Sequence, residues 1–75
     1  MRVLPVTNSA SINAIGFDIE NQLLEVHLKN EVRRYLGVPS GEIEAFVHST
    51  SKGHHYLTFI HNKYASEVIS ASESN

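Results

Sequence analysis

Hydrophobic and polar residues alternate along three segments in the first half of the chain. In residues 12–18 the apolar side chains of Ile15 and Phe17 fall on one side, and residues 24–29 alternate Leu, Val and Leu with Glu, His and Lys. Residues 32–36 repeat the alternation. A period of two residues is typical of strands with one buried face. We therefore predict three strands that follow one another as an antiparallel meander.

The loop between the second and third predicted strands decides which side chains share a face, because opposed residues of an antiparallel pair lie on the same side of a sheet. A two-residue loop at residues 29–30 would put two charges, Glu31 and Arg33, opposite apolar side chains. A three-residue loop at residues 29–31 leaves only Arg34 in such a position, so it keeps more of the apolar residues together. It predicts one buried set, formed by Leu24, Val26, Leu28, Val32 and Leu36. It also predicts an open face that displays Glu25, His27, Arg33 and Tyr35.

A first helix is predicted directly after the strands. Pro39 and Ser40 are residues that favour a helix start. Ile43, Phe46 and Val47 follow at positions i, i+3 and i+4, which places them on one apolar face.

A second helix is predicted from about residue 52 to residue 64, with Ser51 or Thr50 as its N-cap. Its apolar stripe, which we expect in the core, consists of Tyr56, Leu57, Ile60 and Tyr64. Phe59 lies off this stripe by helical spacing, so we expect it to be exposed.

Strands first and helices second favour an α+β domain, here a three-stranded antiparallel meander followed by two helices packed on one face. The other face of the sheet stays open unless a partner or the chain ends cover it. We expect one domain over residues 1–75, ordered from about residue 9 to residue 66. An irregular lead-in is expected over residues 1–8 and a Ser-rich tail over residues 67–75.

Composition supports one small globular domain. The 75 residues are 41% hydrophobic and 19% charged, which is typical of a folded chain with a thin core. The absence of cysteine removes disulfides and thiolate metal sites and fits a reducing cytoplasm. No apolar run approaches the roughly 18–20 residues that span a bilayer. The apolar stretch at residues 1–5 is too short for a signal peptide.

The distribution of charge is more informative than the net charge of −2. Residues 45–66 contain no acid, two lysines (Lys52 and Lys63) and four of the five histidines. The segments on either side contain acids in excess. This acid-free stretch is therefore the one positive region of the chain, and phosphate binding depends on such cations.

Four segments together resemble the KTSC domain, a small module found alone in bacteria and at the C-terminus of some lysyl-tRNA synthetases. They read INAIGFD, LLEVHL, RRYLGVP and STSKGHHYLTFIHNKY, and the resemblance covers roughly residues 9–66. Its anchors, in order, are Phe17-Asp18, Tyr35 to Pro39, and Ser51-Lys52-Gly53 with Tyr56, Ile60 and Tyr64. One departure is that Arg33 stands at the first position of the family's Tyr-x-Tyr motif. The resemblance implies the fold and, since the family has been suggested to bind RNA, an RNA partner.

The histidine spacing does not favour a metal site. Two histidines bind one ion from a helix at i and i+4, but that spacing pairs His54 with Thr58 and His55 with Phe59. His61 is seven residues from His54, about 10.5 Å along a helix axis. We expect histidines on the surface and no cofactor. We also expect that the protein is not an enzyme, because no nucleophile elbow is present and so short a chain leaves little room for a water-excluding pocket of ~300 Å³ or more.

The start of the second helix is one candidate anion site. Free N–H groups and the helix dipole attract anions there, and Lys52, His54 and His55 stand where acids would be the structural choice. The alternative is that Ser51 caps the helix and the histidines are solvated.

The open sheet face is the other candidate, since Arg33 and Tyr35 would stack bases there. The alternative is that Tyr35 packs against residues 3–6. The candidate nucleic-acid-binding residues are Arg33, Arg34, Tyr35, Lys52, His54, His55, His61 and Lys63. The predicted partner is RNA or another single-stranded nucleic acid, and the alternative is a protein or a second copy bound by the open sheet face. We expect no membrane partner.

Overall fold

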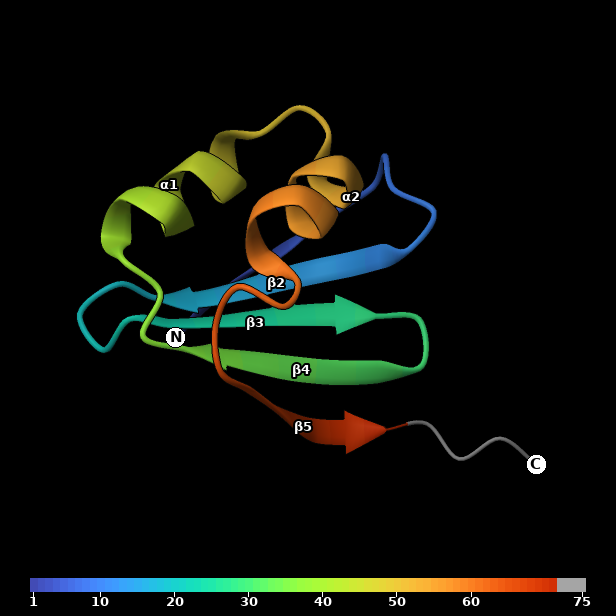
Figure 1. Ribbon diagram of the computed structural model, residues 1–75. Coiled ribbons are helices and arrows are strands. Elements are labelled where there is room, and N and C mark those ends of the chain that lie inside the picture. The colour runs from blue at the N-terminus through green and yellow to red at the C-terminus, as the bar shows by residue number, and fades with distance from the viewer. Residues whose placement is uncertain (72–75) are drawn as a thin grey trace.

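The computed structural model describes residues 1–71 of the chain (Figure 1). Its strands are β1 (Arg2–Pro5), β2 (Ile12–Asp18), β3 (Leu23–Leu28), β4 (Glu31–Leu36) and β5 (Ser66–Ala71). Its helices are α1 (Ser40–His48), α2 (Lys52–His55) and the π-helix η1 (Tyr56–Ile60). The α+β class and the antiparallel meander are confirmed, with five strands in the order β1-β2-β3-β4-β5 where we expected three. Within residues 1–71, no helix is long and apolar enough to cross a membrane.

The two additional strands form the edges of the sheet. β1 lies in the segment expected as an irregular lead-in and pairs with β2, whereas β5 lies mostly in the segment expected as a tail and pairs with β4. Residues 72–75 of that predicted tail lie outside the described part of the chain. These short segments have little apolar alternation. They form strands because their backbone N–H and C=O groups pair with a neighbouring strand.

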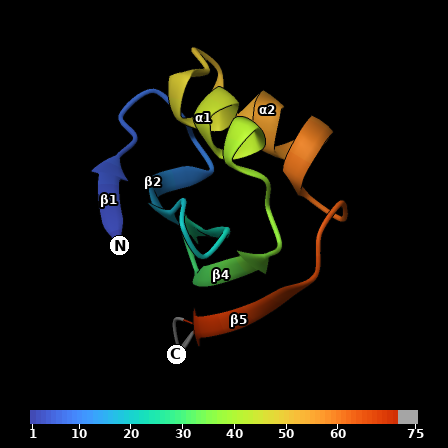
Figure 2. The same ribbon diagram turned by 90° about the vertical axis from the view of Figure 1, so that its left-hand side faces the viewer.

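The helices pack on one face of the sheet (Figures 1 and 2). The core between the two layers consists of Ile12, Ile15, Leu24, Val26, Tyr35, Val38, Ile43, Phe46, Tyr56 and Ile60. No element of residues 1–71 lies over the opposite side of the sheet, which we call the uncovered face (Figure 2).

The register between β3 and β4 corrects the predicted one. Leu24 pairs with Tyr35 and Val26 with Arg33, so the loop has two residues, 29–30, and not three. Tyr35 is therefore in the core at 1% exposure, and Leu36 is 39% exposed.

This register is favoured because it forms stabilising interactions on both faces of the sheet. The Tyr35 ring enters the core, where its hydroxyl lies 2.5 Å from the hydroxyl of Tyr56. The two charges that argued against this loop neutralise each other, because Arg33 Nε donates to Glu31 Oε2 at 2.8 Å. On the uncovered face Arg34 comes opposite Glu25, which is a favourable cross-strand pair.

The prediction for α1 is confirmed. Ile43 and Phe46 are fully buried, and Val47 packs against the core. Pro39, in an extended conformation with φ −60°, precedes the helix as its N-cap. Its fixed φ and missing N–H suit the beginning of a helix.

The second helix is shorter and less regular than predicted. A turn of α-helix continues into the π-helix η1. At its end the N–H of His61 donates a hydrogen bond to the carbonyl oxygen of Tyr56 at 2.7 Å. The chain then turns at Asn62 with a φ of 63°. Tyr56 and Ile60 are buried as expected, but Leu57 is 66% exposed, which corrects the predicted stripe. Phe59 is 49% exposed, in agreement with the prediction.

Candidate interaction surfaces

The uncovered face carries a row of residues that crosses the whole sheet. The pairing registers align one residue from each strand, in the order Val3, Gly16, Glu25, Arg34 and Glu67. Opposed residues of antiparallel strands share a face, so these side chains are neighbours. The row is apolar at β1 and charged from β3 to β5.

Glu25 is the centre of an ion network on this face. Its Oε2 accepts hydrogen bonds from Arg34 Nη2 at 2.8 Å and from Arg34 Nε at 3.3 Å, and its Oε1 lies 3.4 Å from His27 Nε2. Glu67 Oε2 lies 3.9 Å from Arg34 Nη1. Glu25 is only 9% exposed, and a carboxylate so covered needs partners because an unpaired buried charge is costly. The network therefore fixes Arg34 in place.

Apolar side chains flank the network. A Cβ built on Gly16 would lie 3.2 Å from Met1 Sδ and 3.4 Å from Val3 Cγ2, so Met1 and Val3 fill the space that a side chain on Gly16 would occupy. Two residues before Glu25 on β3, Leu23 pairs with Leu36 on the same face. Met1, Val3 and Leu36 are 55%, 53% and 39% exposed. The uncovered face thus combines ordered charge with exposed apolar surface.

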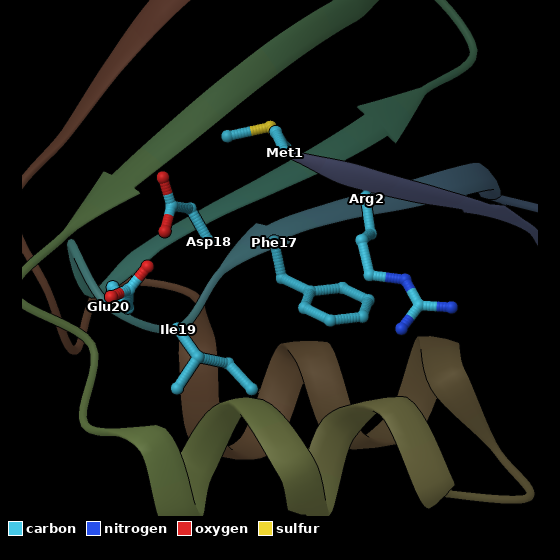
Figure 3. Close-up of a pocket in the computed structure, with 6 residues that line it drawn as sticks. All are labelled: Met1, Arg2, Phe17, Asp18, Ile19 and Glu20. Atoms are coloured by element: carbon cyan, nitrogen blue, oxygen red, sulfur yellow. The ribbon is translucent and has the colours of Figure 1, made fainter.

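A groove of about 470 Å³ lies between α1 and the β1–β2 side of the sheet. It is lined by Arg2, Leu4, Phe17, Ile19, Ile43, Glu44, Val47 and His48. An adjoining hollow of about 380 Å³ shares three of these residues (Figure 3). Figure 3 shows Phe17 and Ile19 directed toward α1, whereas Met1 and Asp18 lie on the other side of the sheet. Because side chains of both charges line the groove, it has no clear preference for a charged ligand.

The predicted anion site at the start of α2 has an internal partner for its lysine. Lys52 Nζ donates to the carbonyl oxygen of Ser49, the C-cap residue that follows α1. A cation there satisfies a free carbonyl and the negative end of the helix dipole. Ser51 makes no side-chain capping bond, and α2 has only four residues. His54, His61 and Lys63 are exposed on the same segment.

His55 lies inside the helix layer. Its ring stacks on Phe46 with 5.4 Å between centroids and lies 4.8 Å from Phe59. Its Nε2 is buried without a hydrogen-bond partner in the described residues. Burial lowers the pKa of His55; Glu42 opposes this shift, and His54 and Lys52 add to it. This ring is therefore a packing group that resists protonation.

The predicted basic and aromatic residues of β4 do not form one surface. Tyr35 is buried and cannot stack a base, and burial raises its pKa well above the usual range. Arg33 lies on the helix side, where it binds Glu31 and donates to Ser66 Oγ at 3.3 Å. Arg34 lies on the uncovered face among acids.

Metal binding finds no geometric support in residues 1–71. No group of three or more His, Asp or Glu side chains in that part of the chain is arranged to hold an ion. His27 lies in β3, His48 in α1, and His54 and His55 are consecutive in α2.

The KTSC domain model matches residues 8–64, which is most of the chain. The chain belongs to the KTSC family. The crystal structure of a KTSC domain protein from Yersinia pestis is similar to it, with 32% sequence identity and a TM-score of 0.84. That match covers 91% of this chain and 96% of the other. No curated protein sequence matched. The family assignment thus agrees with the resemblance seen in the sequence, and it carries the fold of this KTSC domain without naming an activity.

The sequence-based reasoning missed the network on the uncovered face. Glu25 and Arg34 are opposite charges at positions that a two-residue loop brings face to face. The opposite charges of these two residues were a signal for the two-residue loop. The prediction instead chose the register with fewer charges on the apolar face. The cover that Met1 provides over Gly16 had no sequence signal, because it depends on the pairing of β1.

Proposed function

We propose that this KTSC domain is a non-enzymatic protein-interaction module that binds through the uncovered face of its sheet. The observation that carries the proposal is the Glu25–Arg34–Glu67 network, which is held in place beside exposed Met1 and Leu36. Apolar surface supplies contact area in protein interfaces, and ordered charges select the partner and its orientation.

The placement of the arginines supports a protein partner over a nucleic acid. A nucleic-acid site needs cations that converge on one face without acids beside them. Arg33 and Arg34 lie on opposite faces of the sheet, and each contacts a carboxylate. Because Tyr35 is also buried, its ring is not available for base stacking.

Site-specific photo-crosslinking in cells tests the proposal. A photoreactive amino acid at Leu36 samples the uncovered face, and the same group at Leu57 is a matched control on the helix layer, since both side chains are exposed. We expect a defined protein adduct from Leu36 that is weakened by Arg34→Glu and unaffected by nuclease. Equal adducts from both positions, or none from Leu36, would contradict the proposal.

RNA binding is the second candidate, and it rests on α2 and η1. Residues 45–66 contain no acid, and Phe59 is half-exposed near His54, His61 and Lys63 in sequence. An aromatic ring among cations is the arrangement that binds single strands. Acid protonates exposed histidines, so the affinity for RNA is expected to rise from about pH 7.5 to about pH 6 and to fall steeply with salt.

An NMR titration with a short single-stranded RNA tests this candidate. We expect shifts at Phe59 and its neighbours that grow at the lower pH and disappear in a His54→Ala, His61→Ala double variant. His55→Ala is not a useful reporter, because that ring is packed between aromatic rings. An affinity that does not change with pH or salt would rule this surface out.

A further inference from the structure

Within residues 1–71, strand β5 has part of its backbone without a neighbouring strand. It is the last strand in the sheet order, and among the described strands its neighbour is β4 (Figure 1). The N–H of Leu36 donates to the carbonyl oxygen of Ala65 at 2.8 Å. Because hydrogen-bonded and non-bonded pairs alternate in antiparallel strands, the backbone of Glu67 faces β4. The N–H and C=O groups of Ser66 and Val68 therefore point out of the sheet.

The opposite edge of the sheet is blocked, and this edge is not. In β1 the N–H of Val6 donates to the oxygen of Asn13, so by the same alternation Val3 and Pro5 point outward. Pro5 has no N–H to offer, which is a common protection of edge strands. β5 has no proline, lysine or arginine, and its exposed side chains include Val68 and Ile69 at 46% and 43%.

We propose that β5 pairs antiparallel with β5 of a second copy of this chain, which joins the two five-stranded sheets into one. This inference goes beyond the proposed function, because it uses the edge of the sheet and not the uncovered face. Ser66 and Val68 are the two outward residues, so a two-fold axis at Glu67 places Ser66 of each copy opposite Val68 of the other. Both pairs then exchange hydrogen bonds, and the contact is closed because both copies use the same surface.

Two features keep this contact weak. The register of β4 and β5 shifts between Val32 and Arg33, so the regular part of the edge ends near Val68. The two-fold axis also brings the two Glu67 carboxylates opposite each other, and opposed like charges destabilise a strand pair. A pairing so short buries less surface than a stable dimer needs, and it therefore forms at high concentration.

Substitutions at Val68 and Glu67 distinguish this dimer from other association. Val68→Pro removes an outward N–H that β4 does not use, and Val68→Thr is the control because it keeps the N–H and the β-branch. Glu67→Gln removes the opposed charges and is expected to tighten the dimer about 2- to 5-fold. Glu44→Gln is its control, since it makes the same change of charge on α1.

Sedimentation velocity from about 10 µM to about 1 mM, with amide hydrogen exchange at the same concentrations, is the measurement. We expect dimers at the upper end and slower exchange of the Ser66 and Val68 amides there. Val68→Pro should be monomeric, with the far-UV circular dichroism of the parent. If Val68→Pro unfolds, the test rests on whether Glu67→Gln strengthens dimerisation.

Two outcomes would overturn β5 pairing. One is a parent chain that stays monomeric at the highest concentration with unchanged amide exchange. The other is a dimer that survives Val68→Pro and is broken by Leu36→Asp, which would locate the contact on the uncovered face. The proposed function would stand in the second case, and in the first case if crosslinking at Leu36 still captured another protein.

Discussion

The hydroxyl pair of Tyr35 and Tyr56 allows a quantitative test of how the core is held. The oxygens lie 2.5 Å apart, the rings meet edge to face with 5.9 Å between centroids, and the residues are 1% and 6% exposed. Each hydroxyl is thus the partner of the other at a site with little access to water. Tyr35→Phe or Tyr56→Phe leaves one hydroxyl without this partner, which we expect to cost about 1–3 kcal/mol.

The double variant removes both hydroxyls and leaves no unpaired group, so it should cost less than about 1 kcal/mol. A domain of this length has a total free energy of unfolding of about 4–11 kcal/mol, so the variants stay folded. Urea unfolding followed by circular dichroism gives all the values, and the double-mutant cycle gives the coupling. A double variant that costs the sum of the two single variants would refute a coupled pair.

Alkaline titration gives an independent check of the same pair. Burial, followed by the hydrogen bond with Tyr56, raises the pKa of Tyr35. A tyrosine in the unfolded chain ionises near pH ~10, so the stabilisation is present below that pH and is lost as the pH rises above it. This alkaline loss of stability should be smaller in Tyr35→Phe. An equal loss in the variant would contradict the assignment.

Three further changes test other parts of the molecule. Ile60→Ala should cost about 2–4 kcal/mol in a urea melt because the side chain is fully buried, whereas Leu57→Ala at an exposed position should cost less than about 0.5 kcal/mol. Stability should fall as the pH drops below about 6.5, because burial lowers the pKa of His55 and the unfolded chain binds the proton first. Urea unfolding midpoints measured at two pH values should show this fall in the parent and in His54→Leu, but not in His55→Leu. Arg34→Met should cost about 1.5–3 kcal/mol because it removes both hydrogen bonds to Oε2 of the nearly buried Glu25, and a thermal melt equal to that of the parent would contradict a stabilising role for this ion pair.

Period-two alternation predicted the three inner strands, because each of them buries one face. Residues 12–18, 24–28 and 32–36 all lie in strands, and the start of α1 was predictable from Pro39. These signals are local, so the chain reveals them without its tertiary structure. The family motifs added the order of the elements.

The register was not predictable from a count of charges. That count treated Glu31 and Arg33 as two costs, but in the fold they form one ion pair. It also gave no weight to the burial of Tyr35 or to the pairing of Arg34 with Glu25. These stabilising interactions form between strands. They are found only when the residue pairs on both faces of the sheet are compared for each possible register.

The edge strands and the second helix escaped prediction for a different reason. β1 and β5 are held by backbone bonds to β2 and β4, and their side chains carry little pattern. The exposure of Leu57 follows from the π-helix, since the α-helical spacing that we assumed does not apply there. Of the candidate site residues, the exposed His54, His61 and Lys63 lie where a binding role remains testable.

The π-helical turn bears on how members of this family can differ in length. Three consecutive exposed residues, 57–59, lie between the buried side chains of Tyr56 and Ile60. Deletion of Thr58 would shorten the spacing of the buried pair from i, i+4 to i, i+3, and an ordinary α-helical turn keeps both spacings on one face. The backbone would then return from i→i+5 to i→i+4 bonds. Single-residue insertions and deletions should therefore accumulate at this turn among relatives and be rare in α1, because there a shift of one residue would rotate Ile43 away from Phe46.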